Sequence, residues 1–166
     1  GCNDALVLSG AAMRDRVTGR DWHTDGLRQG KKHSFSLLVG VALSDMDKEN
    51  MGNLCVWPRS HHVIHPLMRS PDGKVRRANG GFSDLDGPLP DLGQPTQLLL
   101  KQGDVVFVHS ETGHSGGPHL SSDIRSMLYF RVRHVDWKSM VERDALAVDM
   151  YCDLEGLAST INDSVN

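Results

Sequence analysis

Short apolar runs separated by turn-forming residues recur along this chain, and they constrain its fold more than any other feature. The runs are rich in Val, Leu and aromatic residues, and Gly, Pro, Asp and Asn gather between them. Such runs predict strands. The clearest lie at residues 34–43, 53–57, 96–100, 105–109 and 125–132. A succession of short strands favours a mainly β sandwich or barrel with few helices, and a jelly roll is a natural candidate.

The remaining stretches complete the predicted organisation. Residues 5–8 predict a short buried strand, and residues 137–150 predict one helix. Residues 66–95 are rich in Gly, Pro and Asp, so we expect a long loop there, a candidate lid. A chain of 166 residues fits one domain. We therefore expect a core over residues 1–152 and a polar tail over residues 153–166.

The composition is typical of a soluble globular protein, with 39% hydrophobic and 23% charged residues. The net charge of −3 and the mixing of both signs favour neither a nucleic-acid nor a membrane partner. No apolar run is long enough to span a bilayer, and no secretory signal opens the sequence. Three widely spaced cysteines without a CxxC pair indicate a reducing compartment, so we expect a cytoplasmic location. Cys55 reads as a small core residue.

A candidate metal site begins at His23-Thr24-Asp25 and continues at His114, with Arg125 after it. Two imidazoles and one carboxylate form the ligand set of mononuclear non-haem Fe(II) oxygenases, which leave one face of the metal open. The one-residue gap between His23 and Asp25 requires a strand end or tight turn. On its own the motif is also compatible with a surface turn, because the chain contains nine histidines.

Four blocks, in order, resemble the phytanoyl-CoA dioxygenase family of Fe(II)- and 2-oxoglutarate-dependent oxygenases. The blocks are Trp22-His23-Thr24-Asp25-Gly26, the segment Val41 to Asp45 continued by Gly52 to His61, Gly103-Asp104 with the run after it, and His114 followed eleven positions later by Arg125. Their ordered combination over residues 4–133 is more specific than any single block. The chain departs from the family pattern at Arg59, where glycine is usual, and at His119, where asparagine is frequent. No counterpart of the family's N-terminal helical segment is visible.

The resemblance implies a double-stranded β-helix, the jelly-roll fold shared with cupins. It implies that His23, Asp25 and His114 bind Fe(II), and that Arg125 grips the distal carboxylate of 2-oxoglutarate. The expected reaction uses O2 to hydroxylate a small molecule and releases succinate and CO2. Because Asp25 is present, hydroxylation is favoured over halogenation. A second copy of the chain in a homo-oligomer could supply the cover that the N-terminal segment gives in the family.

Alternatives remain open for several of these residues. His114 could instead be a turn histidine, and His109 is then a less favoured candidate for the distal ligand. Arg125 could instead form a structural ion pair with Asp123. Arg131 and Arg133 read as rim residues rather than cofactor contacts. A structural turn is favoured for His61 and His62. The remaining histidines are expected at the surface or lining the pocket, and these are His33, His65, His119 and His134.

Two other function classes compete with the oxygenase. One is a catalytically idle cupin-like domain that binds a metal or ligand, and the other is a different metal enzyme, such as a hydrolase. Arg125 separates the oxygenase from the hydrolase, because a hydrolase needs no cation to hold a dicarboxylate. The substrate is not readable from the sequence. Basic residues at 69, 74, 76 and 77 are compatible with an anionic substrate, although a solvated loop is favoured.

Overall fold

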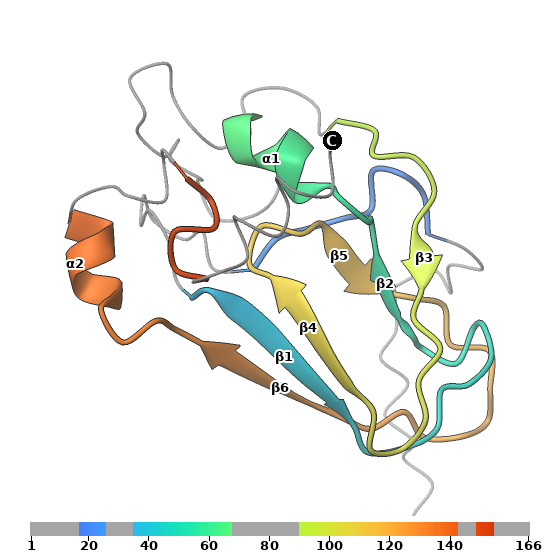
Figure 1. Cartoon of the computed structure of the whole chain (residues 1–166). Helices are drawn as coiled ribbons and strands as arrows, with labels where there is room; N and C mark the ends of the chain where they lie inside the picture. Colours follow the sequence, from blue (N-terminus) through green and yellow to red (C-terminus); the bar gives the residue numbers. More distant parts are fainter. Residues whose placement is uncertain (1–16, 26–34, 68–89, 143–148, 155–166) are drawn as a thin grey trace, which may run out of the picture.

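Strands dominate the computed structural model, which describes residues 17–25, 35–67, 90–142 and 149–154. In chain order the strands of these ranges are β1 Leu37–Ala42, β2 Leu54–Val56, β3 Thr96–Gln97, β4 Val105–His109, β5 His114–Gly116 and β6 Met127–Val132. The helices are short: α1 spans His61–Leu67 and α2 spans Trp137–Glu142 (Figure 1). The prediction of a mainly β chain with few short helices is confirmed.

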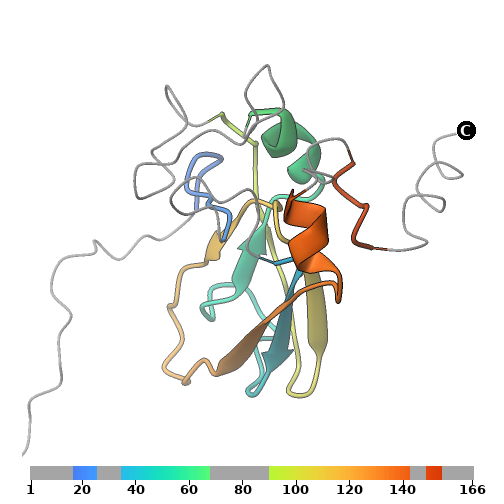
Figure 2. The ribbon, with the colours of Figure 1, turned by 90° about the vertical axis from the view of Figure 1, so that its left-hand side faces the viewer.

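The strands form two antiparallel sheets, which Figures 1 and 2 show from two sides. One sheet has the order β4-β1-β6 and the other the order β3-β2-β5. Leu38 and Val108 of the first sheet pack with Leu54 and Val56 of the second in one buried cluster. The core therefore lies between the two sheets.

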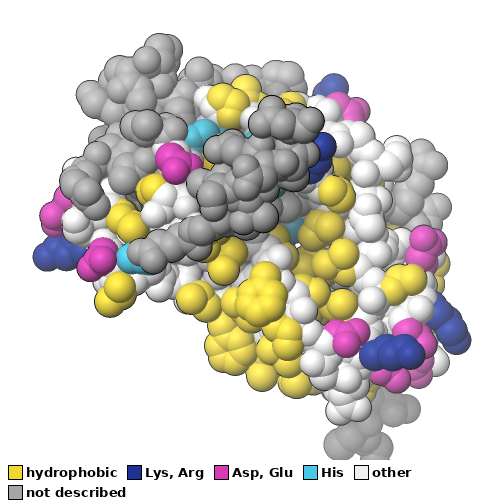
Figure 3. All heavy atoms as spheres, in the orientation of Figure 1, with side chains coloured by type: hydrophobic (Ala, Val, Ile, Leu, Met, Phe, Trp, Pro, Cys, Tyr) yellow, Lys and Arg dark blue, Asp and Glu magenta, His cyan; other side chains and the backbone are white. Residues whose placement is uncertain are grey.

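Strand β1 presents its side chains alternately to the core and to the outside. At Gly40 the side chains of both neighbouring strands leave little room for a side chain. A Cβ there would lie 2.9 Å from Val106 Cγ2 of β4 and 3.0 Å from Tyr129 Cε1 of β6. On the outer face, Val39 pairs with Phe107 of β4 and Phe130 of β6. Phe107 and Phe130 are 70% and 53% exposed. Figure 3 shows hydrophobic side chains gathered on this view of the surface.

The sequence located most strands of the described ranges. The prediction for residues 105–109 matches β4, and β1, β2, β3 and β6 lie inside their predicted runs. His114, for which a turn was the alternative, instead begins strand β5, because it pairs with Val56 of β2. The predicted helix at 137–150 is confirmed over α2, whereas residues 149–150 are not helical. Residues 143–148 lie outside the described part.

The turn expected at His61 and His62 is wrong, because both residues begin helix α1. The carbonyl of Ser60 accepts hydrogen bonds from the backbone amides of Val63 and Ile64, and Ile64 is fully buried. Residues 66 and 67, expected in the loop at 66–95, consequently belong to α1 instead. The strand at 5–8 and loop residues 68–89, with their basic side chains, lie outside the described residues.

Cys55 is confirmed as a core residue. It is fully buried in β2, and burial raises the pKa of its thiol to about 11, so the thiolate needed for catalysis is disfavoured. In the described ranges no helix is both long and apolar enough to cross a membrane.

Candidate metal centre

A reciprocal pair of backbone hydrogen bonds joins His23 to His114. The amide of each residue donates to the carbonyl of the other at 2.9 Å, so residue 23 extends the β3-β2-β5 sheet beyond β5. Side chains of directly opposed residues in an antiparallel pair lie close together. The two imidazole ring centroids are accordingly 4.5 Å apart. Backbone pairing therefore brings together two histidines that are far apart in the sequence.

Asp25 joins them because it follows His23 by two positions in an extended segment, where alternate side chains point the same way. Thr24, between them, is buried instead. Asp25 Oδ1 lies 3.9 Å from His23 Nε2 and 4.0 Å from His114 Nε2. Among the described residues, these three are the one group of His, Cys, Asp and Glu with its ligand atoms close enough for a metal ion, all within 4.8 Å. The structure thus brings the predicted triad together.

The ring of His114 is already in the form that binds a metal. Its Nδ1 lies 2.9 Å from the carbonyl oxygen of Thr112, which can only accept, so Nδ1 carries the proton. Nε2, the atom that faces Asp25, is then left with its lone pair. Burial, together with the nearby His114, lowers the pKa of His23, although Asp25 opposes this shift. The lowered pKa favours the neutral, metal-binding form of His23.

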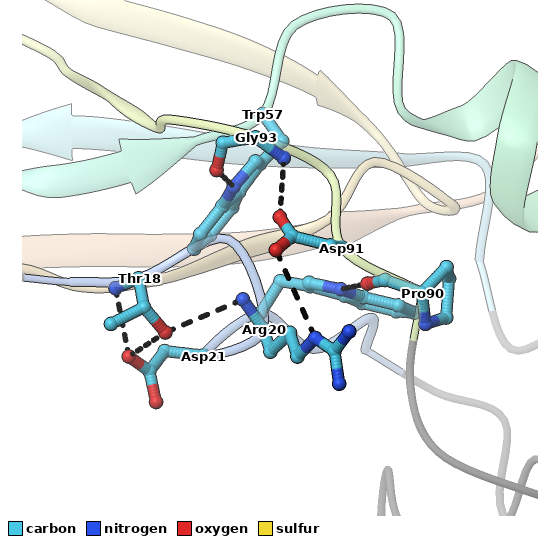
Figure 4. Close-up of polar contacts among 8 residues, drawn as sticks. Thr18, Arg20, Asp21, Trp57, Pro90, Asp91 and Gly93 are labelled. Carbon is cyan, nitrogen blue, oxygen red and sulfur yellow. Dashed lines mark hydrogen bonds and ion pairs between the residues drawn. The ribbon is translucent and has the colours of Figure 1, made fainter.

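The segment just before His23 is held by hydrogen bonds to residues 90–93. Trp22 Nε1 donates to the carbonyl of Pro90, and Trp57 Nε1 donates to the carbonyl of Gly93, each at 3.0 Å. The backbone amide of Leu92 donates to the carbonyl of Gly19 at 2.9 Å. Figure 4 shows this junction between residues 18–21 and 90–93. Both tryptophans are buried, and their hydrogen bonds hold the segment that leads to His23.

Arg131 was expected on the rim, but its guanidinium contacts the candidate site directly. Its Nη2 donates to Asp25 Oδ2 at 2.8 Å. Strand register explains the contact, because Arg131 pairs with Leu38, a position of β1 that faces the core. Burial alone would raise the pKa of Asp25, but the Arg131 hydrogen bond and the nearby charges outweigh it and lower the pKa. Asp25 is therefore favoured as an anion.

Arg125 occupies the same face of the pocket. Its Nη2 donates to the hydroxyl of Tyr129 at 2.6 Å and contacts Met127 Sδ at 3.3 Å. Its Nε is buried and has no hydrogen-bond partner in the described structure. The alternative partner, Asp123, accepts a hydrogen bond from the Ser121 hydroxyl instead. The guanidinium thus keeps a buried donor available for a ligand.

A single pocket of about 540 Å³ holds the triad together with these cations. Its lining includes His23, Asp25, His114, Arg125, Tyr129 and Arg131, with Leu38 and Leu54 as apolar wall. Two guanidiniums face one carboxylate, so the pocket favours anionic ligands. The sequence reading missed Tyr129. Its spacing of four from Arg125 and two from Arg131 along one strand is the signal that could have found it.

The other histidines of the described ranges lie away from the triad. His61, His62 and His109 surround Tyr151, and we call these four residues the tyrosine cluster. His109 is not a distal ligand, because its Nε2 donates to the carbonyl of Met150. His65, expected at the surface or lining the pocket, is buried 2.6 Å from the Glu111 carboxylate. His33 lies outside the described residues.

A family model described as phytanoyl-CoA dioxygenase (PhyH) matches residues 11–127, well over half of the chain. The chain belongs to this family. The matched span contains all three residues of the triad as well as Arg125. No curated protein matches the chain. Membership of the phytanoyl-CoA dioxygenase family supports an oxygenase of the iron- and 2-oxoglutarate-dependent type.

The residues present fit both groups that the family implies. Two imidazoles and one carboxylate suit Fe(II), and His114 offers an unprotonated Nε2 to it. The buried, unpartnered Nε of Arg125 suits the carboxylate of a dicarboxylic acid. The triad and Arg125 line the same pocket, so a metal and a co-substrate could be bound side by side.

Proposed function

We propose that this chain is an Fe(II)- and 2-oxoglutarate-dependent oxygenase that hydroxylates a small molecule. The observation that carries the proposal is the convergence of His23, Asp25 and His114 in the pocket that also contains Arg125. We also propose that the sheets form a double-stranded β-helix. The chain order supports this fold, because β1, β4 and β6 belong to one sheet and β2, β3 and β5 to the other.

Each residue has a defined task in this proposal. His23 and His114 offer neutral nitrogens and Asp25 an anionic oxygen, on one side of the site. Arg125 binds the distal carboxylate of 2-oxoglutarate, and Tyr129, whose hydroxyl accepts from Arg125, helps to orient the guanidinium. When bound, the iron and 2-oxoglutarate supply, with O2, the oxidising power for hydroxylation, with succinate and CO2 as products.

The charges of the pocket agree with a dianionic co-substrate. Arg125 and Arg131 carry two positive charges against the single negative charge of Asp25, and a divalent metal adds two more. A bound dicarboxylate offsets most of this excess. A hydrolase with the same triad has no use for Arg125, which favours the oxygenase over that alternative. The small-molecule nature of the substrate and a cytoplasmic location remain predictions.

Binding of both groups is tested by adding Fe(II) and 2-oxoglutarate without O2 and recording the visible absorption band of the iron–keto-acid complex. We expect the band in the wild type and its loss in His23→Ala and Asp25→Ala. A normal band in both variants would contradict the assignment of the site. Release of succinate in air then separates an active oxygenase from a catalytically idle binding domain.

Replacement of Arg125 tests the co-substrate site separately. Arg125→Gln should weaken 2-oxoglutarate binding by roughly 30-fold or more, the usual effect of losing one partner of a buried charge pair. Binding of Fe(II) alone should change little, because the triad is intact. Calorimetric titrations with Fe(II) and with 2-oxoglutarate measure the two affinities separately. Equal loss of metal and 2-oxoglutarate would show that Arg125 supports the fold and not the ligand.

A further inference from the structure

We propose that Arg131 is a positioning residue that fixes the carboxylate of Asp25 with one oxygen turned toward the two histidines. This inference rests on the proposed function, since it concerns how the chain prepares its metal ligands. Neither the motif that contains Asp25 nor the spacing from His114 to Arg125 includes Arg131.

The two oxygens of Asp25 have different surroundings. Oδ2 accepts the hydrogen bond from Arg131 Nη2 at 2.8 Å. Oδ1 lies 3.9 Å from His23 Nε2 and 4.0 Å from His114 Nε2. The Arg131 contact therefore decides which oxygen faces the metal position. A carboxylate held in this way binds through one oxygen and loses the freedom to rotate.

Arg131 is itself held in place. Its guanidinium carbon lies 5.4 Å from the ring centroid of Phe35, which is almost fully buried. Strand register fixes the other end of the side chain, because Arg131 is opposite Leu38 in the β1–β6 pair. Arg133, two residues further along, instead lies over the ring of Trp137 and does not line the pocket. Arg133 is therefore a control for Arg131, because it has the same charge but does not line the pocket.

Electrostatics and positioning predict opposite effects for the loss of Arg131. A guanidinium near the site repels a divalent cation, so a purely electrostatic role implies tighter metal binding after neutralisation. The Arg131 side chain is 58% exposed, so solvent screens much of that repulsion. Loss of orientation instead weakens metal binding, as removal of hydrogen-bond partners of metal ligands generally does. The sign of the change separates the two roles.

The experiment titrates Co(II), without 2-oxoglutarate, into the wild type and the Arg131→Gln, Arg131→Lys and Arg133→Gln variants. We expect Arg131→Gln to weaken Co(II) binding about 10- to 100-fold and to change the Co(II) visible spectrum. Arg131→Lys should recover part of the loss, because an ammonium can still donate to Oδ2. Arg133→Gln removes the same charge and should leave affinity and spectrum unchanged.

Unchanged or tighter Co(II) binding in Arg131→Gln, with an unchanged spectrum, would overturn the inference and leave the proposed function standing. An equal loss in Arg133→Gln would also overturn it, because the effect would then not depend on the contact with Asp25. Failure of the wild type to bind Co(II) would instead remove the proposed function. If Arg131→Gln does not fold, as shown by circular dichroism, Arg131→Met takes its place, because it keeps an apolar side chain beside Phe35 but no donor for Asp25 Oδ2. Unchanged or tighter Co(II) binding in that variant overturns the inference.

Discussion

The described part of the molecule contains two groups of clustered histidines, and only one of these two is arranged to bind a metal. In the triad, His114 donates through Nδ1 to a backbone carbonyl and leaves Nε2 facing a carboxylate. In the tyrosine cluster, His61 Nε2 lies 2.6 Å from the Tyr151 hydroxyl. Both ring nitrogens of His109 have backbone partners, at 3.0 Å and 3.1 Å. What distinguishes the triad is therefore that its imidazole nitrogens converge with a carboxylate oxygen, and not how many histidines gather.

The charge states of the two groups differ as well. Asp25 supplies an anion to the triad, whereas the rings of the tyrosine cluster face one another. Burial, followed by the charges of His109 and His62, lowers the pKa of His61 to about 4. The lowered pKa favours a neutral His61 ring, which packs against its neighbours and contacts the Tyr151 hydroxyl. It lines a second cavity of about 880 Å³, but nothing in the described ranges makes that cavity a metal site.

The largest expected difference between the two groups is in metal affinity. Asp25→Ala should weaken Co(II) binding by more than about 100-fold, since losing a ligand costs more than losing a ligand's hydrogen-bond partner. His109→Gln, in the tyrosine cluster, should leave Co(II) affinity within about twofold of the wild type. Calorimetric titration of both variants makes the comparison. A comparable loss in His109→Gln would break the distinction drawn between the two groups.

A second effect concerns the junction that positions the triad. A Cβ at Gly19 would lie only 1.9 Å from Asp91 Oδ1 and 2.6 Å from the Gly93 carbonyl oxygen. Gly19→Ala should therefore destabilise the fold by about 1–3 kcal/mol, the usual cost of overpacking. Gly116→Ala is the matched control, because a Cβ there meets nothing within 4 Å. Urea unfolding measures the stability of both variants. Equal stabilities would show that the junction accommodates a Cβ at residue 19 without cost.

A smaller loss is expected when the tyrosine cluster is disturbed. Tyr151→Phe removes a hydroxyl that contacts both His61 Nε2 and His62 Nε2, at 2.6 Å and 3.3 Å. The free energy of unfolding should fall by about 0.5–1.5 kcal/mol, with Co(II) affinity unchanged. Urea unfolding and a Co(II) titration of the same sample test this. A loss of Co(II) affinity would show that the two groups are coupled.

The last effect is a dependence of stability on pH. Because the pKa of His61 in the folded chain is about 4, below its ordinary 6.5, the unfolded chain binds more protons between these values. The contribution of His61 to stability is complete above the ordinary pKa and is lost as the pH falls toward about 4. His61→Gln should therefore lose less stability than the wild type between about pH 7 and about pH 5. Parallel urea titrations check this, and equal losses would exclude the effect.

Local pattern was sufficient to predict most of the strands and the His23–Asp25 pair, the family resemblance added His114, and long-range packing explains what was missed. His23 and Asp25 share a two-residue spacing, and residues 105–109 carry their own strand signal. Arg131, by contrast, meets Asp25 across a separation of 106 residues, and only the β1–β6 register shows which way it points. Tyr151 meets His61 across 90 residues, in a segment without a strand pattern. Contacts of this kind depend on the assembled sheets.

The central claim is that His23, Asp25 and His114 meet around one cation, and pulsed electron paramagnetic resonance of the Cu(II)-loaded chain tests it most directly. Nitrogen modulation should report two imidazole ligands in the wild type and one in each of His23→Gln and His114→Gln. His61→Gln should retain both. Two imidazoles in His23→Gln, or the loss of one in His61→Gln, would contradict the account.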